Sequence, residues 1–158
     1  MAIDPSVVGR ELAPVTAVIE AGRLALFATA TGQDDPVYSD PAAARAAGHP
    51  GVPVPPTFLF GIELDQPEPF GWLTDLGVDL RHVLHGEQSF TYHAQAYAGE
   101  EVTARPHIAE VYSKKSGTLQ FIAKHTRVTR VDGTAVADLE SLIVVREPAP
   151  AHPREEQR

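Results

Sequence analysis

The character of the fold is set by residues 119–146, which read LQFIAKHTRVTRVDGTAVADLESLIVVR. Leu, Phe and Ala occupy every second position over residues 119–123, the period of two that is typical of a β-strand. Asp132 and Gly133 follow, and this dipeptide supplies the positive backbone φ angles of a tight hairpin turn. Residues 134–146 then form the returning strand. The sequence therefore predicts an antiparallel hairpin.

Two more strands are predicted before this hairpin. Residues 89–96 alternate between apolar and polar side chains, and residues 102–112 alternate again. Turns are expected at residues 98–100 and 114–117, each of which contains a glycine. Four consecutive strands joined by short turns predict an antiparallel meander.

The first half of the chain is predicted to be helical and rich in loops. Residues 15–19 suit a short strand, and residues 20–31 carry an apolar helical face that ends at Gly32. A second short helix is expected to begin at Pro41, with Asp40 as its amino-terminal cap.

One longer helix is available to cover the sheet. Residues 57–66 have the apolar spacing of a helix, which Pro67 and Pro69 interrupt. An antiparallel sheet with one apolar face must bury that face against another element. A sheet curled round this central helix is the hot-dog architecture, although periodicity alone equally allows another α+β sandwich.

The composition excludes several classes of function. The chain has 158 residues, 13 Lys and Arg against 21 Asp and Glu, a formal net charge of -8, and no Cys. Without Cys there is no disulfide framework, Cys-based zinc site, iron–sulfur cluster or catalytic thiol. The negative charge argues against nucleic acid and against an anionic membrane surface as partners. The His residues show no metal-ligand spacing, so we predict no metal and no cofactor.

The sequence predicts neither a secretory signal nor a membrane-spanning segment. Residues 1–12 lack the basic stretch and apolar run of a secretory signal, and no stretch approaches the roughly 20 apolar residues of a membrane span. We expect a cytoplasmic protein with a single domain over residues 1–146. Residues 147–158 are polar, rich in Pro and aperiodic, which predicts a disordered tail.

Residues 31–41 carry the most specific motif, TGQDDPVYSDP, followed by three alanines. This stretch resembles the active-site loop of the MaoC-like dehydratases and R-specific enoyl-CoA hydratases, whose pattern is Ser/Thr-Gly-Asp-x-Asn-Pro-x-His-x-Asp. The similarity continues at residues 54–58 and 85–100, as in the N-terminal type of these domains, and covers about residues 9–146. The resemblance implies an α+β hot-dog fold, with an antiparallel sheet wrapped around a central helix, and an acyl-CoA or acyl-carrier-protein thioester as substrate.

The motif departs from the family pattern at its catalytic positions. In catalytic members, the Asp and the His five residues later hold the reacting water and exchange protons with the substrate. Here Gln33 stands at the Asp position, Asp35 at the Asn position and Tyr38 at the His position. An amide exchanges no proton, and a phenol with an ordinary pKa of about 10 is a poor base but a good hydrogen-bond donor. The resemblance therefore implies a degenerate dyad, with Gln33 and Tyr38 at its two positions and Asp35 between them.

Three hypotheses follow from this departure. The chain is the acyl-binding half of a heteromeric dehydratase whose partner supplies the Asp and His, or Asp35 and Tyr38 form an altered active site, or the chain is a non-enzymatic acyl-binding module. The family resemblance favours the first. The same residues also suit ordinary turn chemistry, with Asp40 as a helix cap and Tyr38 as a half-buried aromatic residue.

Substrate contacts are predicted at two further places. The backbone N–H groups of Thr57 and Phe58, at the start of the central helix, are candidate donors to the thioester oxygen, while the Thr57 side chain is a candidate helix cap. His85 and Gly86 are expected to line the site. A helix stopped near Asp65 predicts an open apolar cavity beyond it, with space for a long or bulky acyl group.

Glu63, a few basic residues and the sheet edges suggest an alternative enzyme class, carrier contacts and a partner subunit. Glu63 lies on the central helix, where some hot-dog thioesterases place a catalytic carboxylate, so a thioesterase is a second hypothesis. Arg81 or the Lys114–Lys115 pair could hold the phosphates of the carrier. Hot-dog sheets have exposed edges that are usually paired, so we expect a homodimer, or a heterodimer with a catalytic hot-dog subunit.

Overall fold

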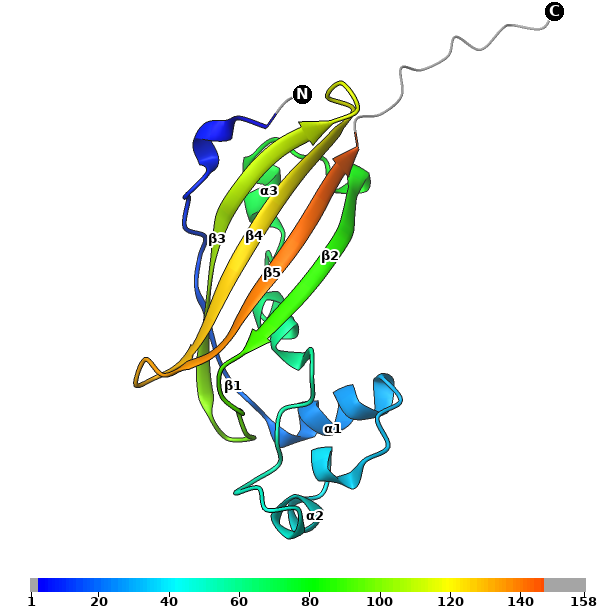
Figure 1. The fold of residues 1–158 in the computed structure, drawn as a ribbon, viewed down its shortest axis with the longest axis vertical. Helices are drawn as coiled ribbons and strands as arrows, with labels where there is room; N and C mark the ends of the chain where they lie inside the picture. The colour runs from blue at the N-terminus through cyan, green and yellow to red at the C-terminus, as the bar shows by residue number, and fades with distance from the viewer. Residues whose placement is uncertain (1–2, 147–158) are drawn as a thin grey trace, which may run out of the picture.

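The computed structural model describes residues 3–146, and its main element is a five-stranded antiparallel sheet (Figure 1). The strands lie in the order β1-β3-β4-β5-β2. Their bounds are β1 Val15–Val18, β2 Val83–Tyr92, β3 Glu101–Lys114, β4 Leu119–Arg130 and β5 Ala135–Arg146. The predicted tail at residues 147–158 lies outside the described residues. Among residues 3–146, no helix is long and apolar enough to cross a membrane.

The predicted meander is correct for three of its four strands. β3, β4 and β5 are consecutive neighbours, but β2 pairs with β5 and not with β3, and β1 pairs with β3 instead. The prediction for residues 89–96 also runs too far, because β2 ends at Tyr92. The chain beyond it pairs with the Pro-rich segment, through an isolated bridge between Pro53 and Tyr97.

The helices gather behind the sheet and below one end of it (Figure 1). The predicted helices near residues 20–31 and 41–47 are confirmed. In the first, Leu24 and Ala28 are buried; in the second, Asp40 Oδ1 accepts a hydrogen bond of 2.7 Å from the N–H of Ala42. The bounds are α1 Ala21–Ala30, α2 Pro41–Ala46 and α3 Gly71–Asp75, with 3₁₀ helices η1 Pro5–Val7, η2 Pro36–Tyr38, η3 Phe58–Leu64 and η4 Leu80–His82.

The central helix differs in kind from the prediction. Residues 58–64 form the 3₁₀ helix η3, which is shorter than the predicted helix, and the chain turns helical again only at α3. Thr57 does not cap η3 with its side chain, so that prediction was wrong; its backbone takes a left-handed conformation with φ of 69°. Such a conformation is uncommon for a β-branched residue and marks local strain.

Two clusters of buried side chains join the helices to the sheet. One packs η3 and α1 against the sheet and includes Phe58, Ile62, Leu24 and Leu139. The other packs α3 on the opposite end of the same face, where Leu73 meets the isoleucines of β3, β4 and β5. The short η3 and the separate α3 leave a break in the helical layer between these clusters.

Candidate functional site

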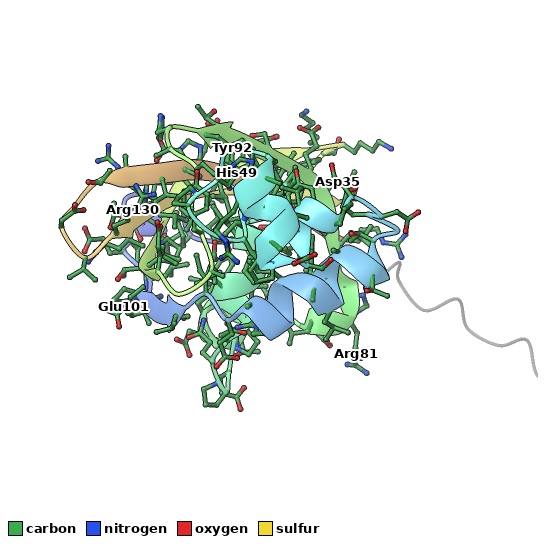
Figure 2. All side chains as sticks on the ribbon, turned by 90° about the horizontal axis from the view of Figure 1, so that it is seen from below. Asp35, His49, Arg81, Tyr92, Glu101 and Arg130 are labelled. Atoms are coloured by element: carbon green, nitrogen blue, oxygen red, sulfur yellow. The ribbon has the colours of Figure 1, made fainter. Side chains whose placement is uncertain are left out.

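The loop that carries the motif is held by its own hydrogen bonds. Gln33 Oε1 accepts from the N–H of Asp35 at 3.2 Å, and Asp35 Oδ1 accepts from the N–H of Val37 at 3.0 Å, which caps η2. Both side chains are exposed, and Asp35 lies at the helical end of the molecule (Figure 2). These residues therefore perform the turn chemistry that their types allow.

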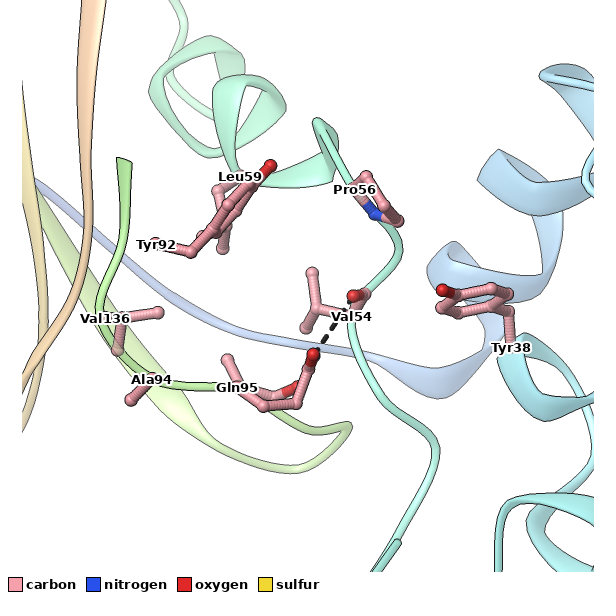
Figure 3. Close-up of a pocket in the computed structure, with 9 residues that line it drawn as sticks. Tyr38, Val54, Pro56, Leu59, Tyr92, Ala94, Gln95 and Val136 are labelled. Carbon is pink, nitrogen blue, oxygen red and sulfur yellow. Dashed lines mark hydrogen bonds between the residues drawn. The ribbon is translucent and has the colours of Figure 1, made fainter. Parts of the chain in front are cut away.

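Tyr38 is the motif residue that reaches a cavity. It lines a space of about 130 Å³ beside the start of η3. In Figure 3 Tyr38 and Tyr92 lie on opposite sides of the segment that carries Val54 and Pro56, and Gln95 below them donates to the Val54 carbonyl at 3.1 Å. The other lining residues are Val54, Leu59, Ala94, Ala96 and Val136. Gln33 and Asp35 do not line this cavity, so the structure does not bring the degenerate dyad together around it.

The start of η3 has its backbone donors occupied. The N–H of Thr57 donates to Tyr92 Oη at 2.9 Å, and the N–H of Phe58 donates to the carbonyl of Pro55 at 3.3 Å. A thioester oxygen at Thr57 must therefore displace the Tyr92 hydroxyl. The Phe58 side chain is buried and packs edge-on against Phe27, with ring centroids 5.5 Å apart. The sequence did not predict Tyr92 as a site residue, although it lies in the alternating strand and within the stretch 85–100 that resembles the family.

A larger cavity lies beyond Asp65, as the Pro67–Pro69 break predicts. Its volume is about 370 Å³, and it is bounded by the end of η3, by α3 and by β2, β4 and β5. Most of its lining is apolar, and four polar residues join that lining. The lining residues are Phe60, Glu63, Leu64, Pro69, Phe70, Trp72, Leu73, Leu80, Val83, Leu84, His85, Lys124, Ser141 and Ile143.

His85 lines this larger cavity as expected, whereas its neighbour Gly86 does not. The His85 ring stacks on Phe60, with ring centroids 5.4 Å apart. Gly86 lies at a β-bulge, where β2 approaches β5 closely: a Cβ there would lie 3.0 Å from Val144 Cγ2 and 3.1 Å from the carbonyl oxygen of Leu142. Glycine therefore permits the strand geometry that sets the place of His85.

Glu63 is buried between η3 and the sheet. Its carboxylate pairs with the Lys124 ammonium and accepts a hydrogen bond of 2.5 Å from Thr126 Oγ1. A catalytic carboxylate of a thioesterase must be free to meet water or the thioester carbon. These two partners occupy the Glu63 carboxylate, so the geometry does not favour that hypothesis.

Two of the candidate phosphate anchors, Arg81 and Lys114, make other contacts. Arg81 Nη2 donates to Asp79 Oδ2 at 2.6 Å, and this bonding holds the pKa of the Asp79 carboxyl well below its usual range. Lys114 lies over the rings of Tyr112 and Phe121 at 5.3 and 5.1 Å. In the described part of the chain, no group of three or more His, Asp or Glu residues is placed to hold a metal ion.

Comparison with known proteins identifies the family. Residues 6–139 match the model of the FAS1-like dehydratase domain region. The chain belongs to the FAS1-like dehydratase domain family. A UPF0336 protein from Saccharopolyspora erythraea is 32% identical to it over 148 residues, covering 92% of this chain and 93% of that protein.

Solved structures confirm the hot-dog fold of this FAS1-like dehydratase domain. A chain of the ChsH1–ChsH2 complex from Mycobacterium tuberculosis superposes with a TM-score of 0.72 at 26% identity, covering 92% of this chain and 91% of that one. A chain of the HadBC (3R-hydroxyacyl-ACP dehydratase) complex from the same organism gives a TM-score of 0.68 at 20% identity, covering 84% of this chain and 94% of that one. MaoC-like dehydratases share the fold as well, which confirms the resemblance drawn from the motif.

Proposed function

We propose that this chain is the acyl-thioester-binding subunit of a (3R)-hydroxyacyl dehydratase or enoyl-thioester hydratase, and that a second hot-dog subunit supplies the proton-transfer groups. The observation that carries the proposal is the identity and placement of Gln33 and Tyr38. Reversible hydration needs a group that takes a proton and a group that gives one. An exposed amide at the Asp position cannot take one, and the phenol of Tyr38, which lines the smaller cavity, is a hydrogen-bond donor and a poor base.

The larger cavity supports the acyl-binding part of the proposal. A space of about 370 Å³ falls in the range of small-molecule sites, and its apolar lining suits an acyl chain. It opens where Pro67 and Pro69 end the helical layer, so the break in the central helix provides the room. His85, which lines the cavity, and the adjacent Gly86 are proposed substrate contacts.

The sheet edge and the solved complexes support the partner. β2 is an edge strand, and Leu84 and Tyr92 on it are half exposed. Edge strands offer unpaired N–H and C=O groups and are commonly covered in native proteins. The ChsH1–ChsH2 and HadBC structures are both complexes of two chains. We therefore propose pairing with a second hot-dog chain, a catalytic subunit or a second copy of this one.

One experiment separates this proposal from its alternatives. The full-length chain is incubated with crotonyl-CoA or a longer enoyl-CoA, and two signals are followed: the absorbance of the conjugated thioester and the release of free thiol. We expect binding with no change in either signal, and loss of the enoyl absorbance once the catalytic partner is added. Enoyl loss without the partner indicates an active site built on Asp35 and Tyr38, and thiol release indicates a thioesterase. If the thioester binds but neither the enoyl absorbance nor the free thiol changes with any candidate partner, the chain is a non-enzymatic acyl-binding module.

A further inference from the structure

A row of polar side chains crosses the apolar wall of the larger cavity. Lys124 on β4 is the register partner of Ser141 on β5, and Ser141 is in turn the partner of Gln88 on β2. Directly paired residues in antiparallel strands project to the same face of the sheet. Lys124 and Ser141 are 7% and 4% exposed, and both line the cavity. We call Lys124, Ser141 and Gln88 the polar row.

The neighbours of the polar row on the same face are apolar with one exception. In β4 the inward positions beside Lys124 are Ile122 and Thr126, and in β5 those beside Ser141 are Leu139 and Ile143. The row is therefore a narrow polar band in an otherwise apolar surface. Two of its members are joined by a hydrogen bond of 2.6 Å from Ser141 Oγ to Gln88 Oε1.

Glu63 brings a carboxylate from η3 to this row. It pairs with Lys124, and both side chains are buried. Burying an ion pair costs several kcal/mol of desolvation per ion, and apolar residues of similar volume are often as stable or more stable in such places. A gain in folding stability therefore does not account for a charged pair at the edge of this cavity. A role in binding a ligand would account for it.

The Lys124 ammonium has donors to spare. It carries three N–H bonds, and among the described residues its hydrogen-bond partner is the Glu63 carboxylate. Both residues line the cavity, so the remaining donors lie at the boundary of the space that an acyl group would fill. A neutral oxygen in the cavity would satisfy one of them. A plain alkyl chain there would leave them without a partner, which is costly in an apolar site.

We infer that the larger cavity takes an acyl group bearing a hydroxyl or keto oxygen remote from the thioester, and that Lys124, oriented by Glu63, determines this specificity. The inference rests on the proposed function, because it assumes that an acyl thioester enters the cavity. A neutral oxygen suits the site because Glu63 already balances the ammonium charge. The oxygen accepts from Lys124, and the rest of the acyl group packs on the apolar lining.

The test compares oxygenated and plain acyl thioesters by titration calorimetry on the full-length chain. The probes are dodecanoyl-CoA and positional isomers of hydroxydodecanoyl-CoA, with the hydroxyl moved from the middle to the end of the chain. We expect one isomer to bind about 10- to 100-fold more tightly than dodecanoyl-CoA, the effect of one hydrogen bond to a charged donor. If dodecanoyl-CoA binds as tightly as every isomer, the inference is overturned. If no thioester binds, the proposed function fails first and this inference with it.

A variant assigns the effect to Lys124. The triple change Glu63→Leu, Lys124→Met and Thr126→Val replaces Glu63 and its two hydrogen-bond partners with apolar residues of similar volume. It therefore leaves none of the three without a partner. We expect it to bind the preferred isomer and dodecanoyl-CoA equally. The matched control, Arg127→Gln with Asp138→Asn, removes an ion pair on the outer face of the same two strands and should keep the preference. A preference that survives in the triple variant would overturn the role of Lys124; the comparison on the unmodified chain stands without any variant.

Discussion

The backbone N–H of Thr57 donates a hydrogen bond of 2.9 Å to the Tyr92 hydroxyl. This contact joins the strained start of η3 to the end of the edge strand β2, across 35 positions of sequence. It places a side-chain oxygen where the family resemblance predicts a thioester oxygen. The Tyr92 hydroxyl therefore competes with the thioester oxygen for the Thr57 N–H. A thioester that binds there must displace this hydroxyl.

Removing this hydroxyl tests the competition. Tyr92→Phe frees the Thr57 donor, so enoyl-CoA should bind about two- to tenfold more tightly, while the free energy of unfolding falls by about 0.5–1.5 kcal/mol, the net value of one hydrogen bond. Calorimetric titration and urea unfolding measure the two effects. Tyr97→Phe is the control, because Tyr97 lies beside His49 at a ring distance of 5.9 Å and away from Thr57. Unchanged or weaker binding in Tyr92→Phe would show that Thr57 does not hold the thioester oxygen.

The buried ion pair predicts a non-additive stability pattern. Lys124→Met alone leaves the Glu63 carboxylate buried without its counter-charge, and should lower the free energy of unfolding by about 3–5 kcal/mol. The triple variant with Glu63→Leu and Thr126→Val should recover most of that loss, because no charge or hydroxyl is then left unpaired. Urea unfolding of the chain and of both variants measures this. A triple variant less stable than the single one would contradict the assignment of these contacts.

The glycine at the β-bulge predicts a steric cost. Gly86→Ala places a methyl group about 3 Å from Val144 and from a backbone carbonyl, so β2 must shift away from β5. We expect a loss of about 1–3 kcal/mol, as for an overpacked core site, measured by thermal or urea unfolding. Gly61→Ala is the matched control, since a Cβ there meets nothing within 4 Å. Equal stability of the two variants would mean that the strands approach less closely than described.

The Asp79–Arg81 pair predicts a pH effect at low pH. Because Arg81 lowers the pKa of Asp79 in the folded chain, the carboxylate contributes stability above the unfolded-state pKa of about 3.9, and that contribution is lost as pH falls through the lower folded-state pKa. Asp79→Asn should therefore be less stable than the original chain at neutral pH, and the difference should shrink at low pH. Urea midpoints across the acid range measure it, with the exposed Asp34→Asn as control. A difference independent of pH would rule out the linkage.

Local features of the fold were predictable because local chemistry determines them. The Asp40 cap, the stop at Gly32 and the Asp132–Gly133 hairpin all depend on residues close in sequence. The place of β2 beside β5 was not predictable, because alternation tells which side chains share a face of a strand and not which strand lies next to it. The helical form of η3 escaped prediction for a similar reason: apolar spacing over seven residues fits a 3₁₀ helix and an α-helix alike.

The candidate site was predicted in part. The motif led to Tyr38, and the Pro67–Pro69 break led to the larger cavity, because both leave a mark on the sequence. Tyr92 and Lys124 act through contacts made only in the folded chain. Lys124 left no such mark, because it takes the polar position in the alternation of residues 119–124, and β4 turns that position to the core. Its partner Glu63 did leave one, a charged residue in an apolar helical segment.

The central claim is that this chain binds the acyl thioester while another subunit moves the protons. The most direct measurement is the enoyl-CoA hydration rate of the reconstituted complex, made once with the intact partner and once with a partner whose catalytic Asp and His have been replaced by Asn and Ala. Our account predicts full activity in the first case and none above background in the second, with Tyr38→Phe in this chain leaving most of the activity intact. Hydration that persists with the disabled partner would contradict it, because the proton-transfer groups would then lie in this chain.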